Sequence, residues 1–162
     1  MALNLFRALP IADTVYQDEL LPTDTKDYVR DQITLGWEAR LKARGRRTSD
    51  GGAEFATALP RGTVLREGDV LLVAALRMHV RVVEALESVF VVRPTTADEA
   101  ARFAYQIGNS HQPLMLADGL LICPDVLGMA QVLDHHGIAY ERTKRAFTPV
   151  SQVTNHQHAV VR

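Results

Sequence analysis

The side chains of this sequence that could bind a metal or transfer protons are six histidines and one cysteine. They are His79, His111, His135, His136, His156, His158 and Cys123. Neutral imidazole is a ligand for nickel, copper and zinc alike. These residues form no serine–histidine–aspartate order, glycine-rich phosphate loop or two-cysteine zinc motif. The sequence therefore favours metal binding by histidine over a reaction and predicts no catalytic residue.

Four of these residues have a structural explanation. His79 lies among valines in a predicted strand. His135 and His136 fall in the last turn of a predicted helix, where the helix dipole favours a partly charged imidazole. Cys123 precedes Pro124 at the predicted start of that helix, where a thiolate would be stabilised, but no clear base is close to it in sequence. None of the four is taken as a metal ligand.

The remaining histidines point to one metal site. His156 and His158 flank a single residue near the end of the sequence, and imidazoles so close together can bind one ion. Such a pair needs a further ligand from the folded part of the chain. His111 stands alone in a predicted turn after Gly108, so it is the best candidate. The predicted metal ligands are therefore His111, His156 and His158.

The first half of the chain is predicted to form a small β-barrel-like domain over residues 1–76. Its turn signals recur about every eight to twelve residues, which is typical of small barrels and sandwiches. No histidine precedes His79. We expect strands at 32–37, 46–49, 54–58 and 70–74, and one helical turn at 38–43.

The second half predicts a ferredoxin-like domain over residues 77–147. From Val89 the order is strand, helix, strand, strand, helix, strand, which gives a four-stranded sheet with two helices on one face. Thr96 and Glu99 form a capping box for the first helix, and Gly108 is expected to end it. The second helix is expected to run from Pro124 to Gly137. Residues 148–162 lack a packing period and are expected to form a mobile, histidine-bearing tail, so the fold class is α+β.

Composition limits the classes of partner. The formal net charge is −1, so the overall electrostatic field of the protein does not attract nucleic acid or anionic lipid. No apolar run approaches the roughly 20 residues of a membrane span, and the amino terminus does not resemble a secretion signal. A single cysteine fits a reducing compartment. We expect a cytoplasmic protein without a membrane partner.

A basic segment supports an alternative. Its charges are Arg40, Lys42, Arg44, Arg46 and Arg47. They form either a solvated face or the surface of an RNA- or ribosome-associated binding module. The sequence lacks the aromatic pattern of an RNA-binding sheet, so nucleic acid is the less favoured partner. A zinc hydrolase using His111, Cys123 and an acid is least favoured, because no ligand pair has the i, i+4 spacing of such sites.

Residues 44–52 with 59–69, followed by residues 105–114, resemble the nickel metallochaperone family of urease accessory protein E (UreE). This resemblance implies an amino-terminal β domain that binds partner proteins and a ferredoxin-like domain that forms a homodimer. Two copies of His111 would share one Ni(II) ion at the dimer interface, and His156 and His158 would complete its shell. Zn(II) and Cu(II) suit the same ligands. The implied partners are the urease maturation GTPase and the complex of urease apoprotein with its accessory proteins.

The sequence departs from the family pattern at three places. Gln106 stands where many members have a histidine, Cys123-Pro124-Asp125 stands where some have further histidines, and the tail carries only two. Storage of several ions is therefore not expected, and the single interface site remains. The resulting hypothesis is a homodimeric nickel chaperone that delivers its ion for urease maturation and is not an enzyme.

Overall fold

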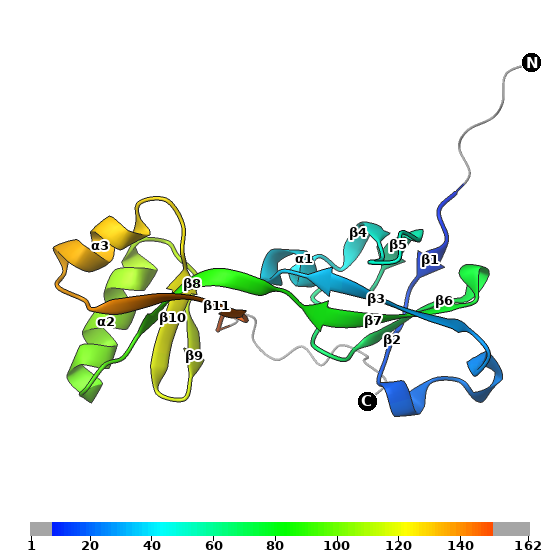
Figure 1. The fold of residues 1–162 in the computed structure, drawn as a ribbon, viewed down its shortest axis with the longest axis horizontal. Coiled ribbons are helices and arrows are strands. Elements are labelled where there is room, and N and C mark those ends of the chain that lie inside the picture. The colour runs from blue at the N-terminus through cyan, green and yellow to red at the C-terminus, as the bar shows by residue number, and fades with distance from the viewer. Residues whose placement is uncertain (1–7, 151–162) are drawn as a thin grey trace, which may run out of the picture. The chain divides into compact units, whose positions relative to one another are not determined.

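The structure is a computed structural model that describes residues 8–150 (Figure 1). The described residues form two compact units that divide between Glu84 and Ala85. Each unit has its own hydrophobic core.

The first unit is built from short strands arranged in two sheets (Figure 1). One sheet has the order β1-β5-β4 and the other the order β2-β6-β7-β3. Strand β3 pairs in parallel with β7, although the two are far apart in the sequence. The elements are β1 (Ile11–Ala12), β2 (Val15–Tyr16), η1 (Asp18–Leu20), η2 (Thr23–Thr25), β3 (Val29–Leu35), α1 (Trp37–Leu41), β4 (Arg44–Thr48), β5 (Glu54–Ala58), β6 (Val70–Val73), η3 (Ala74–Leu76) and β7 (Met78–Glu84).

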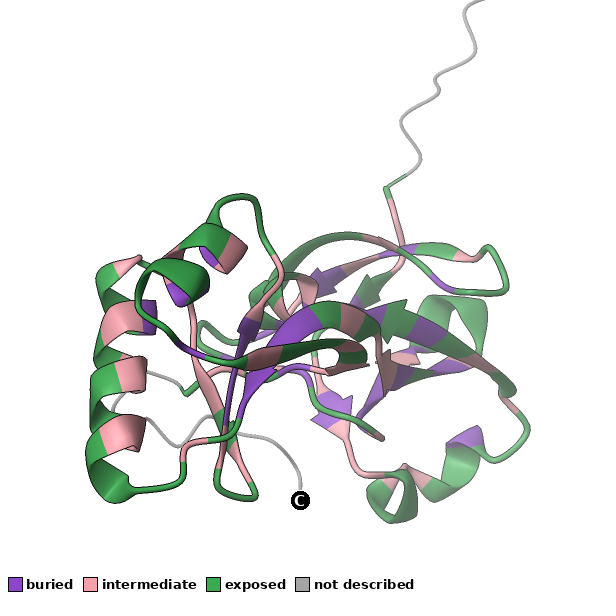
Figure 2. Cartoon of the chain, turned by 60° about the vertical axis from the view of Figure 1, so that its left-hand side comes forward, coloured by how far each residue is buried: buried purple, intermediate pink, exposed green. Residues whose placement is uncertain are grey.

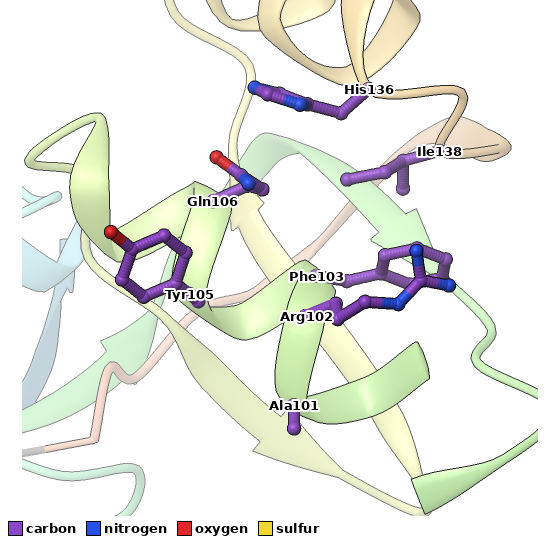
Figure 3. A pocket seen from close by; sticks show the side chains of 7 residues that line it. All are labelled: Ala101, Arg102, Phe103, Tyr105, Gln106, His136 and Ile138. Carbon is purple, nitrogen blue, oxygen red and sulfur yellow. The ribbon is translucent and has the colours of Figure 1, made fainter. Parts of the chain in front are cut away.

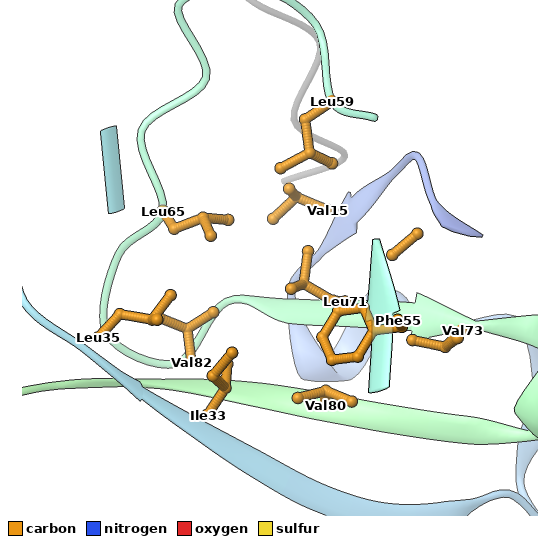
Figure 4. Packing of buried hydrophobic residues seen from close by; sticks show 11 residues of the cluster. Val15, Ile33, Leu35, Phe55, Leu59, Leu65, Leu71, Val73, Val80 and Val82 are labelled. Atoms are coloured by element: carbon orange, nitrogen blue, oxygen red, sulfur yellow. The ribbon is translucent and has the colours of Figure 1, made fainter. Parts of the chain in front are cut away.

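The core of the first unit follows from the period-two alternation of its strands. On β7, Val80 and Val82 are buried and Arg81 between them is exposed. Phe55 of β5 and Leu71 of β6 lie in the same cluster (Figure 4). Because residues of both sheets share one core, the β-rich domain is confirmed. Within the described residues the strands form two sheets and not a closed barrel.

The boundary between the units differs from the expected one. The sequence placed it between residues 76 and 77, but β7 pairs with β3 and β6 of the first unit. Residues 77–84 therefore belong to the first unit. The valines of β7 would suit a strand in either unit, and only the pairing partners decide between them.

The second unit has the predicted ferredoxin-like topology. Its elements are β8 (Leu86–Val92), α2 (Ala97–Asn109), β9 (Met115–Ala117), β10 (Leu120–Pro124), α3 (Met129–His135) and β11 (Tyr140–Ala146). The sheet has the order β11-β8-β10-β9, and every neighbouring pair is antiparallel. Residues of α2 and α3 pack with Phe90, Val92 and Cys123 on one face of the sheet. Buried positions line the central strands, while α2 exposes its outer face (Figure 2).

The second helix starts later than expected. Pro124 is the last residue of β10, where it lies opposite Val89 of β8. Helix α3 begins at Met129, after Gly128 with a φ of 88°. At the end of a strand, the missing N–H of a proline removes no hydrogen bond between strands. Pro124 is therefore compatible with a strand end as well as with a helix start, and strand pairing places it in β10.

Candidate metal centre

Helix α2 positions His111, and its amino-terminal end is fixed by the predicted cap. The Thr96 side chain accepts a hydrogen bond from the Glu99 backbone N–H at 3.1 Å. The Glu99 carboxylate accepts from the hydroxyl and the backbone N–H of Thr95, both at 2.7 Å. The Thr95 hydroxyl and then its backbone N–H lower the pKa of Glu99. The capping residues are therefore confirmed.

The carboxyl-terminal end of α2 lies beyond the expected residue. Gly108 remains helical, Ser110 is the C-cap, and His111 adopts a left-handed φ of 56°. The His111 N–H donates to Gly108 O at 2.9 Å, and the Gln112 N–H donates to Ile107 O at 3.3 Å. These two bonds define a Schellman motif with His111 at C′. The expectation that Gly108 ends the helix is wrong.

His111 therefore stands where glycine is usually found. A non-glycine residue in this conformation costs about 1–2 kcal/mol. Its side chain is exposed, and within residues 8–150 the imidazole has no hydrogen-bond or ion-pair partner. Strained backbone in a well-defined turn often marks a functional position. The arrangement holds an imidazole at a fixed place with its nitrogens free to bind a ligand.

A cavity of about 310 Å³ lies between α2 and the end of α3. Gln106 and His136 face one another across it, with Phe103 and Ile138 beside them (Figure 3). The backbone carbonyl of Gln106 accepts a hydrogen bond from the Ser110 hydroxyl at 3.0 Å, which links this wall to the His111 turn. One imidazole and one amide do not complete a metal site.

The remaining histidines of the folded part lie in structural settings. His135 is in the last turn of α3 and His136 is its C-cap, near the helix end where the sequence placed them. His79 is buried on β7, where its Nε2 lies 2.9 Å from the Thr25 hydroxyl.

Cys123 is not placed for metal binding. It lies on β10, fully buried in the core of the second unit. Loss of solvation, reinforced by Asp125, raises the pKa of its thiol to about 12. The thiolate that a metal or an electrophile would require is therefore disfavoured. The expected helix-terminal position of Cys123 is wrong because α3 begins six residues later.

The described residues do not bring three potential ligands together. Within residues 8–150 no group of three or more His, Cys, Asp and Glu side chains could hold a metal ion. His156 and His158 lie outside the described residues. A site centred on His111 therefore needs ligands from a second copy, from the tail, or from both.

The basic segment is not one continuous surface. The Arg40 side chain is 1% exposed and forms an ion pair with Glu84 at 2.8 Å. Arg47 donates to the carbonyl oxygens of Ala39 at 2.9 Å and Lys42 at 2.5 Å, and burial lowers its pKa. Two of the five charges thus stabilise the fold, which weakens the RNA-binding alternative.

Among residues 8–150 no helix combines the length and the apolar character needed to span a bilayer.

Comparison with known proteins identifies both halves of the chain. The family model "UreE urease accessory protein, N-terminal domain" matches residues 13–83, and the corresponding C-terminal domain matches residues 87–161. The gap between the two matches contains the boundary after Glu84.

Curated relatives agree with this identification. Proteins named urease accessory protein UreE from Burkholderia mallei (strain SAVP1) and Burkholderia thailandensis are 42% and 43% identical over 117 residues. That overlap is 72% of this chain and 57% and 54% of the relatives, so the chain spans about half the length of the curated relatives it matches. Both domain models and the relatives' identity agree, and the chain belongs to the UreE urease accessory protein family.

Proposed function

We propose that this protein is a homodimeric nickel chaperone for urease maturation, in which His111 of both copies binds one Ni(II) ion. The observation that carries the proposal is the exposed imidazole of His111 at a strained, hydrogen-bonded helix end. It delivers an ion and is not an enzyme, in keeping with a family described as accessory proteins.

Two-fold symmetry explains how a single histidine can serve as a metal site. An isologous interface doubles every ligand near its axis, so one His111 per chain becomes two per dimer. His156, His158 and water then complete a nitrogen-rich shell. This agrees with the lack of a three-ligand group within residues 8–150.

An open, exposed site suits transfer better than storage. The imidazole of His111 lies at the surface, so a recipient can approach the ion without unfolding the domain. The names of the relatives connect them with urease. We place the protein in the cytoplasm, with the urease maturation GTPase and the complex of urease apoprotein and accessory proteins as recipients, and the first unit as the domain that contacts them.

In this proposal, the availability of each metal ion and the coordination geometry decide which ion occupies the site. Imidazole ligands bind Zn(II) and Cu(II) as well as Ni(II), and copper usually binds most tightly. A titration with Ni(II) beside Zn(II) therefore belongs in any test of the site.

Equilibrium titration of His111→Ala with Ni(II) tests the proposal. The unaltered protein should bind about one tight ion per two chains. His111→Ala should bind at least about ten-fold more weakly, since loss of even an outer-shell partner of a metal ligand often costs that much. His135→Ala is the matched control, because His135 is also exposed near a helix end. Unchanged affinity in His111→Ala would refute the central role of this residue.

A further inference from the structure

Strand β4 leaves one side of its backbone unpaired. It is an edge strand of the β1-β5-β4 sheet (Figure 1). In an antiparallel ladder, residues that bond to the neighbouring strand alternate with residues whose N–H and C=O point away from it. Ala56 lies opposite Arg46, and its N–H donates to Pro10 O on the other side of β5 at 2.8 Å. The backbone groups of Arg44, Arg46 and Thr48 therefore point away from β5.

These outward groups are accessible. Arg44, Arg46 and Thr48 are exposed, and so is Gly45. Within residues 8–150, the outward N–H and C=O groups of the first three have no hydrogen-bond partner. We name this row of backbone groups, from Arg44 to Thr48, the β4 edge.

The other edge strands of the first unit are short or covered. Strands β1 and β2 have two residues each. The outer side of β3 is occupied by Asp50, whose N–H donates to Gln32 O at 2.8 Å and whose carboxylate accepts from the Thr34 N–H at 3.0 Å. Among residues 8–84, β4 is therefore the long edge strand that is open to a further strand.

The side chains of β4 determine which strand can be added. Arg44 and Arg46 share one face of the sheet, where the residues opposite them on β5 are Ala58 and Ala56. Within residues 8–150 neither guanidinium has an ion-pair partner. Gly45 lies between them, and no atom comes within 4 Å of the Cβ position that it lacks. The β4 edge thus offers two free positive charges with open space between them.

This charge pattern distinguishes among possible occupants. Like charges brought together across two strands are destabilising, so the arginines oppose pairing of β4 with a second copy of itself. Single-stranded RNA is bound largely by stacking of its bases on aromatic side chains, and β4 has none. An extended chain with carboxylates opposite the arginines satisfies both the backbone groups and the charges.

We propose that the β4 edge binds an extended segment of a partner protein, with acidic residues at alternate positions, as an added strand. The acidic side chains pair with Arg44 and Arg46, and the residue between them lies beside Gly45. Main-chain hydrogen bonds supply affinity in such complexes, and the alternate side chains supply specificity. The inference rests on the proposed function, in which the first unit contacts the recipient of the ion.

Peptide binding to the full chain tests the charge requirement. The probe is a short fluorescent peptide of alternating glutamate and threonine, and a lysine–threonine peptide is its control. Arg44→Gln/Arg46→Gln should bind the glutamate peptide about three- to ten-fold more weakly, because two exposed ion pairs are lost. Arg93→Gln/Arg102→Gln removes the same charge from the second unit and should bind as the unaltered protein does. Fluorescence anisotropy measures each affinity.

A backbone variant tests the addition of a strand. Thr48→Pro removes an outward N–H but keeps both arginines, so it should also bind about three- to ten-fold more weakly. Thr48→Val keeps that N–H and should bind as the unaltered protein does. Thermal unfolding establishes that each variant is folded. In the unaltered protein, the amides of Arg44 and Arg46 should exchange rapidly and become protected when the glutamate peptide binds.

Three results would overturn the proposal. They are equal affinity for the two peptides, unchanged affinity in Arg44→Gln/Arg46→Gln, and unchanged affinity in Thr48→Pro. Binding of a single-stranded RNA oligomer in preference to the glutamate peptide would likewise overturn it and assign the arginines to RNA. All of these variants should bind Ni(II) normally, because β4 and His111 lie in different units. Failure here is thus distinguishable from failure of the proposed function, which is decided by His111→Ala.

Discussion

His111 occupies a backbone position at which glycine would be more stable. The left-handed conformation costs an ordinary residue about 1–2 kcal/mol, and the exposed ring recovers little of this through burial. Residues that oppose stability in this way are often retained for function. At the scale of the residue, strain and exposure together distinguish His111 from His79, His135 and His136.

This view predicts that His111→Gly stabilises the protein. Glycine adopts a positive φ without steric cost, so the free energy of unfolding should rise by about 1 kcal/mol. Urea unfolding followed by circular dichroism measures the change. Gln131→Gly, in the middle of α3, should have the opposite sign, because glycine destabilises a helix interior by roughly 0.5–1 kcal/mol. If His111→Gly proved less stable than the unaltered protein, the C′ assignment would be wrong.

The sequence identified His111 as a ligand candidate but not its backbone conformation. A turn after Gly108 that contains Asn109, Ser110 and His111 was predicted, since glycine, asparagine and serine disfavour a continuing helix. The actual end depends on the bonds from His111 to Gly108 and from Gln112 to Ile107, which no single residue type specifies. The burial that makes the Cys123 thiol unreactive could not be predicted from the sequence either, because it depends on the whole core of the second unit.

At the scale of elements, local signals were reliable where they acted within a few residues. The Thr96 cap lies within one turn of its partner, and it was predicted correctly. Pro124 was misassigned because proline suits both a helix start and a strand end. The assignment of β7 required knowledge of its pairing with β3, a contact between distant segments that no local pattern contains.

Strand β7 also contains a buried group that links stability to pH. The Thr25 hydroxyl donates its one proton to Pro22 O at 2.7 Å, so His79 Nε2 must donate to Thr25. Among the described residues the buried Nδ1 of His79 has no partner, so a second proton there would be left without a hydrogen bond, which favours the neutral ring protonated at Nε2. Burial lowers the pKa of His79, the charge of Arg30 lowers it further, and Asp18 opposes the shift.

The sign of this shift predicts acid destabilisation of the first unit. An unfolded histidine has a pKa of about 6.5. Between that value and the lower folded pKa, the unfolded state binds more protons than the folded state. The free energy of unfolding therefore falls as pH decreases below about 6.5, and this contribution is fully present above that pH. Thermal unfolding of the full chain between about pH 5 and pH 8 measures this dependence. His79→Phe, which keeps a ring beside Tyr28, should flatten the dependence, and an equal slope in both proteins would contradict the assignment.

At the scale of the whole molecule, each unit can be understood from its own core. The first unit buries one face of each of its sheets, and the second buries its helices against a single sheet. The proposed metal site cannot be understood from one unit in the same way, because the residues described in one chain supply only a single free imidazole to it. In the proposed homodimer both copies are needed to complete it, so a test at this scale must change the composition of the dimer.

Mixed dimers provide that test. When equal amounts of unaltered and His111→Ala chains exchange freely, about one quarter of the dimers contain two copies of His111. If both copies are required, tight nickel binding should fall to about one quarter of its original capacity, and not to one half. Titration of the mixture with Ni(II) measures the capacity, and native mass spectrometry establishes that the chains have exchanged.

The corresponding mixture with His135→Ala chains should keep its full capacity, because His135 is not a ligand of the proposed interface site. A capacity of about one half in the His111→Ala mixture would mean that each chain binds its own ion, and symmetry would then play no part in the site. A capacity of about one quarter requires that the ion be shared, since only then does loss of one imidazole remove the site from both chains.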